Sequence, residues 1–316
     1  EAFFAPYVDM TLYPTPDLIV IARDNGVSLL TLGFLQATED GRPGWAGLAA
    51  LATDSEHEQA KAINASIAAF KAAGGDVMIS LGGANGVSLA QSYAQRGKSA
   101  QELADAYGAV VDTYGLNRID FDIEGNAVAD PSSIALNAQA LKLFQQQRPD
   151  VEIWYTLPVL PSGLTADGLN VVDKALQAGV QLDGVNVMAM DYGEGPAPTS
   201  GPNAKTMGAY AIDAAESTYT QLSALYGSHG QTFSWNQLGV TPMIGVNDVQ
   251  TEVFTLADAQ LLEDFARTKG LGMVSMWSVG RDKPGPVVRS CRHRPGWATP
   301  PAAPVAPGMT TAPSTP

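Results

Sequence analysis

The sequence predicts an α/β fold in which one (β/α)8 barrel, a TIM barrel, occupies residues 1–297. Short β-rich apolar runs alternate along this part of the chain with segments of helical periodicity, a pattern typical of a parallel sheet covered by helices. There are eight such runs, and eight parallel strands close a barrel of this kind. A doubly wound open sheet is the alternative, which is disfavoured because no glycine-rich dinucleotide turn follows the first run.

The strand candidates are spread over the whole barrel region. In chain order they are Phe3–Asp9, Val27–Leu35, Asp76–Gly82, Arg118–Glu124, Glu152–Pro158, Gly184–Met190, Leu238–Gly245 and Gly272–Trp277. Helix signals lie between them. Residues 56–74 carry apolar side chains at helical spacing and end in a Gly-Gly pair, and the Asp-Pro pair at 130–131 is typical of a helix start. Thr255 and Asp258 have the spacing of a capping box, and Gly270 ends that helix.

Composition and charge exclude several classes of protein. The 316 residues include 32 acidic and 18 basic side chains, for a formal net charge of -14. This balance argues against binding to nucleic acid or to anionic membranes, because both depend on Lys and Arg. No apolar run reaches the roughly 18 residues that a membrane span needs. With Cys291 as the only cysteine, a disulfide scaffold and a Cys/His zinc site are excluded, and we expect no metal and no cofactor.

The two ends of the chain differ from the barrel region. Residues 298–316 consist almost entirely of Pro, Ala and Thr, which predicts an extended linker. We expect this linker either to tether a second module or to be a free terminus. The chain begins at Glu1 with neither a Met nor a basic-then-apolar signal segment, as expected of a mature or trimmed form.

The segment RIDFDIEG at residues 118–125 carries the strongest chemical signal. Side chains alternate between the faces of a strand, so Asp120, Asp122 and Glu124 share one face, while Ile and Phe side chains occupy the other. In a barrel these carboxyls point inward, and Glu124 lies nearest the C-terminal mouth, where barrel active sites are found. A solvated edge strand and a Mg²⁺ or Mn²⁺ site are the alternatives.

Three carboxyls arranged in this way cannot all stay ionised. Alternate residues of a strand lie ~6.6 Å apart. Like charges at that spacing, partly removed from water and without a basic neighbour, raise the pKa of at least one carboxyl. A carboxyl that stays protonated near neutral pH is what a general acid requires.

The spacing D-x-D-x-E at the end of a fourth barrel strand resembles the signature of glycoside hydrolase family 18, the chitinases and their relatives. The fuller family pattern is D-G-x-D-x-D-x-E, and this chain departs from it at the first two positions, Asn117 and Arg118. Three further segments match in order, namely SLGG at 80–83, MAMDYG at 188–193, and MWS at 276–278 followed by Arg281 and Asp282. Met190 occupies the usual Tyr position of the second of these segments. The resemblance covers about residues 3–285.

The resemblance implies a mechanism in which the substrate takes part. Glu124 would protonate the glycosidic oxygen, and the acetamido group of the sugar would attack its own anomeric carbon to form an oxazolinium ion. Asp122 would orient the acetamido N–H and share a proton with the deeper Asp120. Asp191 and Tyr192 would hold and polarise the acetamido group.

Four further residues are candidates for substrate binding. By the same resemblance, Trp277 forms the floor beneath the reacting sugar, because an aromatic face suits the C–H face of a pyranose. We expect Met188 to line the pocket wall and Asn247 to donate a hydrogen bond to the substrate. Tyr7 ends the first strand at the same mouth.

Two tryptophans lie outside these motifs. Trp45 and Trp235 stand beside Gly, Pro and Asn in loop-like stretches. Either they line further sugar subsites or they pack within their own loops.

The function that the resemblance implies is that of an endo-acting chitinase, with chitin or N-acetylglucosamine oligosaccharides as its partner. An endo-β-N-acetylglucosaminidase acting on N-glycans is the alternative within the same class. A chitin-binding lectin on an inactive barrel is disfavoured because such proteins typically lack the acid, and Glu124 is present. A metal-dependent barrel enzyme is the fourth hypothesis. We expect a secreted monomer, with a carbohydrate-binding module beyond the linker.

Overall fold

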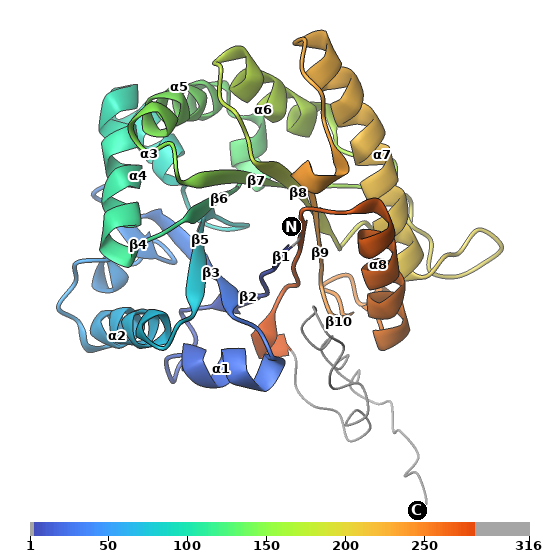
Figure 1. Cartoon of the computed structure of the whole chain (residues 1–316), viewed down its shortest axis with the longest axis horizontal. Coiled ribbons are helices and arrows are strands. Elements are labelled where there is room, and N and C mark those ends of the chain that lie inside the picture. The colour runs from blue at the N-terminus through green and yellow to red at the C-terminus, as the bar shows by residue number, and fades with distance from the viewer. Residues whose placement is uncertain (1–2, 282–316) are drawn as a thin grey trace, which may run out of the picture.

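The computed structural model describes residues 3–281 and confirms the predicted barrel. Its parallel strands form one ring with helices around it (Figure 1). The strands of the ring are β1 Phe3–Phe4, β2 Tyr7–Asp9, β3 Leu29–Ala37, β5 Asp76–Gly82, β6 Arg118–Asp122, β7 Glu152–Pro158, β8 Gly184–Ala189, β9 Leu238–Pro242 and β12 Met273–Val274. Three short strands lie outside it: β4 Pro43–Trp45, β10 Gly245–Val246 and β11 Val253–Phe254.

The first predicted strand closes the ring by dividing its pairing between two neighbours. Phe3–Asp9 is one extended run in the sequence, but its first part, β1, pairs with β12 and its second part, β2, pairs with β3. The last predicted strand is shorter than expected, since regular pairing covers only Met273 and Val274 and a single bridge joins Trp277 to Met243. Because β1 and β2 together occupy one strand position, eight strand positions close the barrel.

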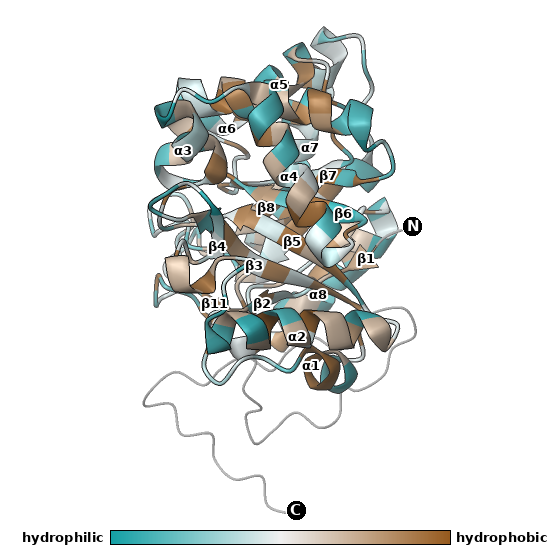
Figure 2. Cartoon of the chain, turned by 90° about the vertical axis from the view of Figure 1, so that its left-hand side faces the viewer, coloured by the Kyte–Doolittle hydropathy of each residue, from teal (hydrophilic) through white to brown (hydrophobic). Residues whose placement is uncertain are grey.

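Helices cover the outside of the barrel (Figure 1). They are α1 Leu18–Asn25, α2 Glu58–Ala72, α3 Leu89–Gln95, α4 Ala100–Tyr114, α5 Pro131–Gln147, α6 Ala166–Gln177, α7 Met207–Ser228 and α8 Leu256–Lys269, with 3₁₀ turns η1 Ala49–Leu51, η2 Gly125–Ala129, η3 Trp235–Gln237 and η4 Val279–Arg281. The predicted caps are confirmed: α5 has Pro131 in its first turn, Thr255 and Asp258 form a capping box on α8, and Gly270 ends α8 in the left-handed conformation. Figure 2 shows hydrophobic colouring on several of the central strands, whereas the helices around them carry both hydrophobic and hydrophilic segments.

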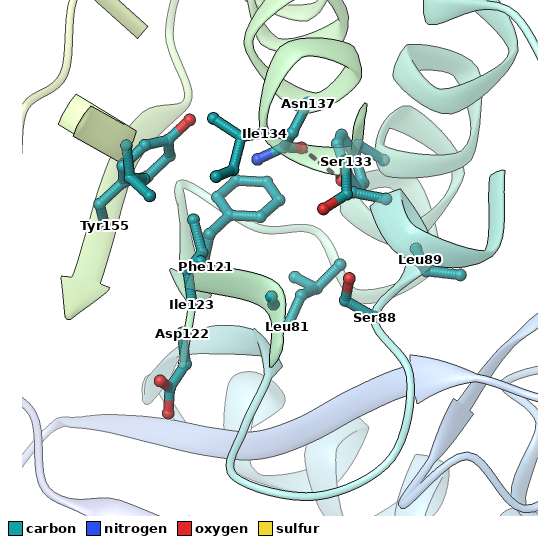
Figure 3. A pocket seen from close by; sticks show the side chains of 14 residues that line it. Leu81, Ser88, Leu89, Phe121, Asp122, Ile123, Ser133, Ile134, Asn137 and Tyr155 are labelled. Carbon is teal, nitrogen blue, oxygen red and sulfur yellow. Dashed lines mark hydrogen bonds between the residues drawn. The ribbon is translucent and has the colours of Figure 1, made fainter. Parts of the chain in front are cut away.

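The two faces of β6 meet different surroundings, as its alternating sequence predicts. Phe121 packs between the barrel and the helices, where its ring lies 4.9 Å from that of Tyr107 and 6.1 Å from that of Tyr155. In Figure 3, Asp122 points away from the apolar side chains around Phe121. The carboxyls of this strand therefore face the barrel interior.

The barrel interior changes from apolar to polar along its axis. At the N-terminal end of the strands, Met78, Trp154 and Met273 form a buried cluster with Phe3 packed against it. The Trp154 ring fills the space in which a Cβ at Gly184 would lie, only 2.1 Å from the nearest ring atom. Above this cluster the buried polar side chains include Ser80, Asp120, Thr156, Asn186 and Thr241. The site thus opens only at the C-terminal end of the strands.

Several sequence features lie outside the described residues. They are Asp282, Cys291 and the predicted linker at residues 298–316. Among the described residues no helix is both long and apolar enough to cross a membrane. In the same part of the chain, no group of three or more His, Cys, Asp or Glu side chains is arranged to hold a metal ion.

Candidate active site

A cleft of about 1240 Å³, counting its solvent-facing mouth, opens at the C-terminal ends of the strands. Six of the predicted site residues line it: Tyr7, Asp122, Glu124, Met188, Asp191 and Trp277. Other lining residues come from the ends of neighbouring strands and from the loops that follow them, and include Asp9, Phe34, Gln36, Asn85, Met190, Met243 and Asp248. The carboxyl end of a barrel is where loops from many strands converge, so residues distant in sequence meet there.

Asp120 lies beneath the cleft floor and is fully buried. Its Oδ2 accepts hydrogen bonds from the hydroxyls of Ser80, at 2.7 Å, and Tyr7, at 3.2 Å, and its Oδ1 accepts one from the Thr156 hydroxyl at 2.7 Å. Burial raises the pKa of Asp120 to about 6, while the three hydroxyl donors act in the opposite direction. These donors stabilise the ionised form of this carboxyl.

A relay of polar side chains extends from Asp120 across the barrel. The Asn186 amide nitrogen donates to the Thr156 hydroxyl oxygen at 3.0 Å, and the Thr241 hydroxyl donates to the Asn186 amide oxygen at 3.0 Å. Because an amide nitrogen only donates, the hydroxyl hydrogen of Thr156 is left for Asp120. Sequence reasoning missed these three residues, and their only sequence signal is a polar side chain inside an otherwise apolar strand.

Asp122 and Glu124 form the reactive pair at the floor of the cleft. Asp122 is 4% exposed, and within the described residues its Oδ1 has no hydrogen-bond partner. Burial raises the pKa of Asp122, and the charges of Glu124 and Asp120 raise it further. Burial also raises the pKa of Glu124, whereas a hydrogen bond from Asp122 lowers it. The two carboxyls thus share a hydrogen bond, and both bind a proton more readily than free carboxyls do.

The expectation that Asp122 shares a proton with Asp120 stays a prediction. The oxygens of Asp120 already accept hydroxyl hydrogens from Tyr7, Ser80 and Thr156. Asp122 makes its side-chain hydrogen bond with Glu124.

The chain turns sharply after β8, and this turn decides which side chains reach the cleft. Asp191 has a left-handed backbone with φ of 52°, a conformation that Asp tolerates better than most residues. Its Oδ1 accepts a hydrogen bond from the Val249 N–H at 2.9 Å. The next residue, Tyr192, is directed away from the cleft and packs edge-on against Tyr210, with ring centroids 6.1 Å apart. Met190 lines the cleft instead.

Besides Asp120, which lies beneath the floor, Tyr192 and Asn247 are the predicted site residues that do not line the cleft. The Tyr192 side chain is buried, and within the described residues its hydroxyl has no hydrogen-bond partner. Asn247 is 3% exposed, and its amide nitrogen donates to the carbonyls of Met243, at 2.9 Å, and Gly245, at 3.2 Å. Both amide hydrogens are thus used inside its own loop, which corrects the expectation that Asn247 faces the substrate.

Three aromatic rings form one wall of the cleft. Trp277 stacks on Phe34, with ring centroids 5.4 Å apart and planes 21° apart. Tyr7 lies 5.8 Å from Trp277 and 6.0 Å from Phe34. Phe34 was not predicted, because no motif marks it. The three rings offer the flat apolar surface on which a sugar ring can stack.

The two loop tryptophans lie elsewhere. Trp45 is buried, and its ring lies edge-on to Tyr114. Trp235 precedes β9, at the opposite end of the barrel, and stacks on Tyr219 with centroids 3.9 Å apart. Packing, the simpler of the two expectations, is therefore the observed one.

The cleft is strongly acidic. Five carboxylate side chains line it, namely Asp9, Asp122, Glu124, Asp191 and Asp248. The described lining residues include no Lys, Arg or His. The arrangement thus combines two carboxyls of raised pKa, further acidic side chains and an aromatic wall. It can donate a proton and stabilise a developing positive charge.

Comparisons with known proteins agree with this geometry. The family model for glycosyl hydrolases family 18 matches residues 13–226. The chain is 41% identical over 291 residues to the "Probable bifunctional chitinase/lysozyme" of Escherichia coli strain K12, and 40% identical over 288 residues to "Endochitinase 11" of Metarhizium anisopliae. Each alignment covers 89% of this chain but only 31% and 52% of the respective relative.

A solved structure agrees in fold as well as in sequence. The catalytic domain of the hyperthermophilic chitinase from Pyrococcus furiosus is 35% identical to this chain, with a TM-score of 0.75. The match covers 90% of this chain and 86% of that domain. The carboxylate pair at the mouth of the fourth barrel strand, the family match and this shared fold lead to one conclusion: the chain belongs to glycoside hydrolase family 18.

Proposed function

We propose that this chain is a chitinase that hydrolyses β-1,4 bonds between N-acetylglucosamine units. The observation that carries the proposal is the Asp122–Glu124 pair, two hydrogen-bonded carboxyls of raised pKa at the floor of a cleft with an aromatic wall. Identities of 35–41% to proteins described as chitinases support the choice of substrate.

Hydrolysis would proceed in two steps through the substrate's own acetamido group. Glu124 gives its proton to the glycosidic oxygen as the bond to the anomeric carbon breaks, and the acetamido oxygen forms a new bond to that carbon. Asp122 accepts the acetamido N–H, and with Asp191 it stabilises the positive charge of the oxazolinium ring. In the second step Glu124 takes a proton from water, whose oxygen attacks the anomeric carbon and reopens the ring.

The surroundings of the three carboxyls suit these two reaction steps. Asp120 has three hydroxyl donors that favour its ionised form, so it holds negative charge beneath the reacting sugar. Trp277 and Phe34 would hold the sugar ring by stacking. Met188 and Met190 would line the wall beside the acetamido group.

The wider setting of the enzyme is also part of the proposal. An insoluble polymer cannot enter a cell, so we propose that the enzyme is secreted and acts outside the cell as a monomer. A module that binds the polymer would raise the local concentration of the catalytic domain on a solid surface.

The configuration of fresh products tests the mechanism. Two successive inversions at the anomeric carbon leave the β anomer, so proton NMR of products from an N-acetylglucosamine hexamer is expected to show β first. Partially deacetylated chitin is expected to give new reducing ends that are acetylated, because an ammonium group cannot close the oxazolinium ring. A dominant α anomer, or reducing ends that are mostly deacetylated, would contradict the mechanism. Activity on a high-mannose glycoprotein but not on the hexamer would favour the endo-β-N-acetylglucosaminidase.

A further inference from the structure

Glu252 is a buried carboxyl next to the cleft that the proposed mechanism does not use. It lies in the loop between β10 and β11 and is 0% exposed. Its Oε1 accepts the Tyr192 N–H at 3.2 Å, and its Oε2 accepts the Gly193 N–H at 2.8 Å. In the described part of the chain, backbone N–H groups rather than Lys or Arg side chains hold this carboxylate.

The geometry of the turn explains why a carboxylate fits there. Asp191 and Gly193 both have left-handed backbones, with φ of 52° and 86°. Successive N–H groups in such a turn point into one concavity, which binds anions. The Glu252 carboxylate occupies that concavity with one oxygen on each N–H. A charge without ionic partners is retained in the interior when several N–H groups point at it.

Further hydrogen bonds join the same two loops, and one of them runs in the opposite direction, from the loop at 247–252 to the turn at 191–193. Asp191 accepts the Val249 N–H through Oδ1, and its own N–H donates to Asn247 Oδ1 at 3.4 Å. The Asn247 N–H in turn donates to the Glu252 carbonyl at 2.9 Å. The turn at 191–193 and the loop at 247–252 therefore hold each other through reciprocal contacts.

We propose that Glu252 is a positioning residue that fixes the Asp191 carboxyl in the cleft by holding the turn at 191–193. Glu252 does not line the cleft and acts only through Asp191. This inference rests on the proposed function for its effect on catalysis, and on the hydrogen bonds between the two loops for its effect on structure.

Glu252→Gln is the test substitution, because it keeps the size of the side chain. Its amide nitrogen faces an N–H group, so one of the two hydrogen bonds to the turn is lost. We expect kcat on an N-acetylglucosamine hexamer to fall roughly 10- to 100-fold, the scale set by small misplacements of a reacting group. The KM is expected to change much less.

A double-mutant cycle separates positioning from a general loss of structure. In an Asp191→Asn background, Glu252→Gln is expected to change kcat by less than about twofold, because the residue through which it acts is already altered. Glu263→Gln is the matched control: Glu263 is 5% exposed and pairs with Arg267 on α8. This control is expected to leave kcat unchanged.

Gly193→Ala examines the same turn if Glu252→Gln does not fold. A Cβ there meets no atom within 4 Å, but the φ of 86° is unfavourable for alanine, so the turn itself is disturbed. We expect Gly193→Ala to lower kcat as much as Glu252→Gln does. In the Asp191→Asn background, we expect it to change kcat as little as Glu252→Gln does. A well-folded Glu252→Gln with wild-type kcat, or an equal fall of kcat in both backgrounds, would overturn the inference.

Amide hydrogen exchange gives a readout that does not depend on activity. The Val249 N–H donates to Asp191, so loosening of the turn is expected to speed its exchange at least about tenfold in Glu252→Gln and not in Glu263→Gln. A wild-type protein without activity on the hexamer would refute the proposed function alone, and unchanged Val249 exchange would refute the positioning role.

Discussion

Neighbouring side chains give Asp120, Asp122 and Glu124 different tendencies to bind a proton, although all three alternate along β6 and the residues that follow it. Asp120 receives three hydroxyl donors, and its ionised form is favoured. Asp122 is buried with one oxygen unpartnered among the described residues, so it favours the protonated form. Glu124 is only partly buried and lines the cleft. A proton bound by this pair can be passed to the glycosidic oxygen of a substrate that lies above it.

Glu124→Gln is expected to lower kcat roughly 10²–10⁴-fold, the usual contribution of a general acid. The amide has the size and polarity of the carboxyl but cannot give up a proton. Steady-state kinetics on the hexamer measure the loss, and oligosaccharide binding by calorimetry shows whether the cleft is intact. A well-folded variant with activity within a few-fold of wild type would refute the assignment of the acid.

Asp122→Asn is expected to make the protein more stable while it reduces activity. Burial raises the pKa of Asp122 above its value in the unfolded chain, so the folded state binds more protons between the two pKa values. The free energy of unfolding of the wild type therefore falls as pH rises through that range, and the Asn variant escapes this loss. We expect no gain at about pH 4, near the unfolded pKa, and a gain of at least about 1 kcal/mol at pH 8.

Thermal unfolding at a series of pH values measures this difference. Asp112→Asn is the control, because the Arg148 guanidinium lowers the pKa of Asp112 and the expected effect has the opposite sign. An Asp122→Asn variant that is less stable than wild type at pH 8 would show that the charge at Asp122 is compensated in the folded protein.

Among the elements, strands β7, β8 and β9 matter because each contributes one polar side chain to the barrel interior. Thr156, Asn186 and Thr241 form a line of hydrogen bonds that ends at Asp120. The direction of the Thr156 hydroxyl depends on Asn186, two strands away from Asp120. Side chains on β7, β8 and β9 thus influence the pKa of Asp120 on β6.

Thr156→Val tests this relay, because valine has nearly the same shape and no hydroxyl. Loss of one donor is expected to raise the pKa of Asp120 further above about 6. If Asp120 acts as an anion, the acidic limb of the pH profile of kcat/KM moves to higher pH. Ser275→Ala is the control, since its buried hydroxyl donates to the Ala5 carbonyl and not to the carboxyls. A limb that does not move would exclude Asp120 as the group that titrates there.

The elements also show how far sequence could predict the site. Alternation along β6 was enough to align Asp120, Asp122 and Glu124, because a period of two is a local property. Tyr192 was expected at the site from the family resemblance, but the left-handed backbone of Asp191 redirects the side chain that follows it. Phe34 belongs to no motif and becomes part of the wall only when the barrel closes. Sequence therefore predicted strands and their faces, and it could not predict contacts between the loops that follow them.

For the whole molecule, the closure of the barrel and the distribution of charge act together. Phe3–Asp9 joins the last strand to the second, and this brings Tyr7 beside Trp277 from the far end of the chain. The loops that meet at the resulting mouth contribute carboxylates to the cleft, in a chain whose formal net charge is -14. A cleft lined by charges of one sign focuses the electric field and attracts ligands of the opposite sign.

This field predicts a salt dependence that differs between two forms of the substrate. Fully acetylated chitin is neutral, whereas partially deacetylated chitin carries ammonium groups, and those outside the bond-cleaving subsite are attracted to the acidic cleft. The Debye length falls from about 30 Å at 0.01 M salt to about 10 Å at 0.1 M, so added NaCl screens this attraction. We expect kcat/KM for partially deacetylated oligosaccharides to fall several-fold over that range, and kcat/KM for the acetylated hexamer to stay constant. Asp248→Asn, which removes one exposed charge from the cleft lining, is expected to reduce the slope for the cationic substrate alone. The same salt dependence for both substrates would mean that the acidic cleft does not select among them.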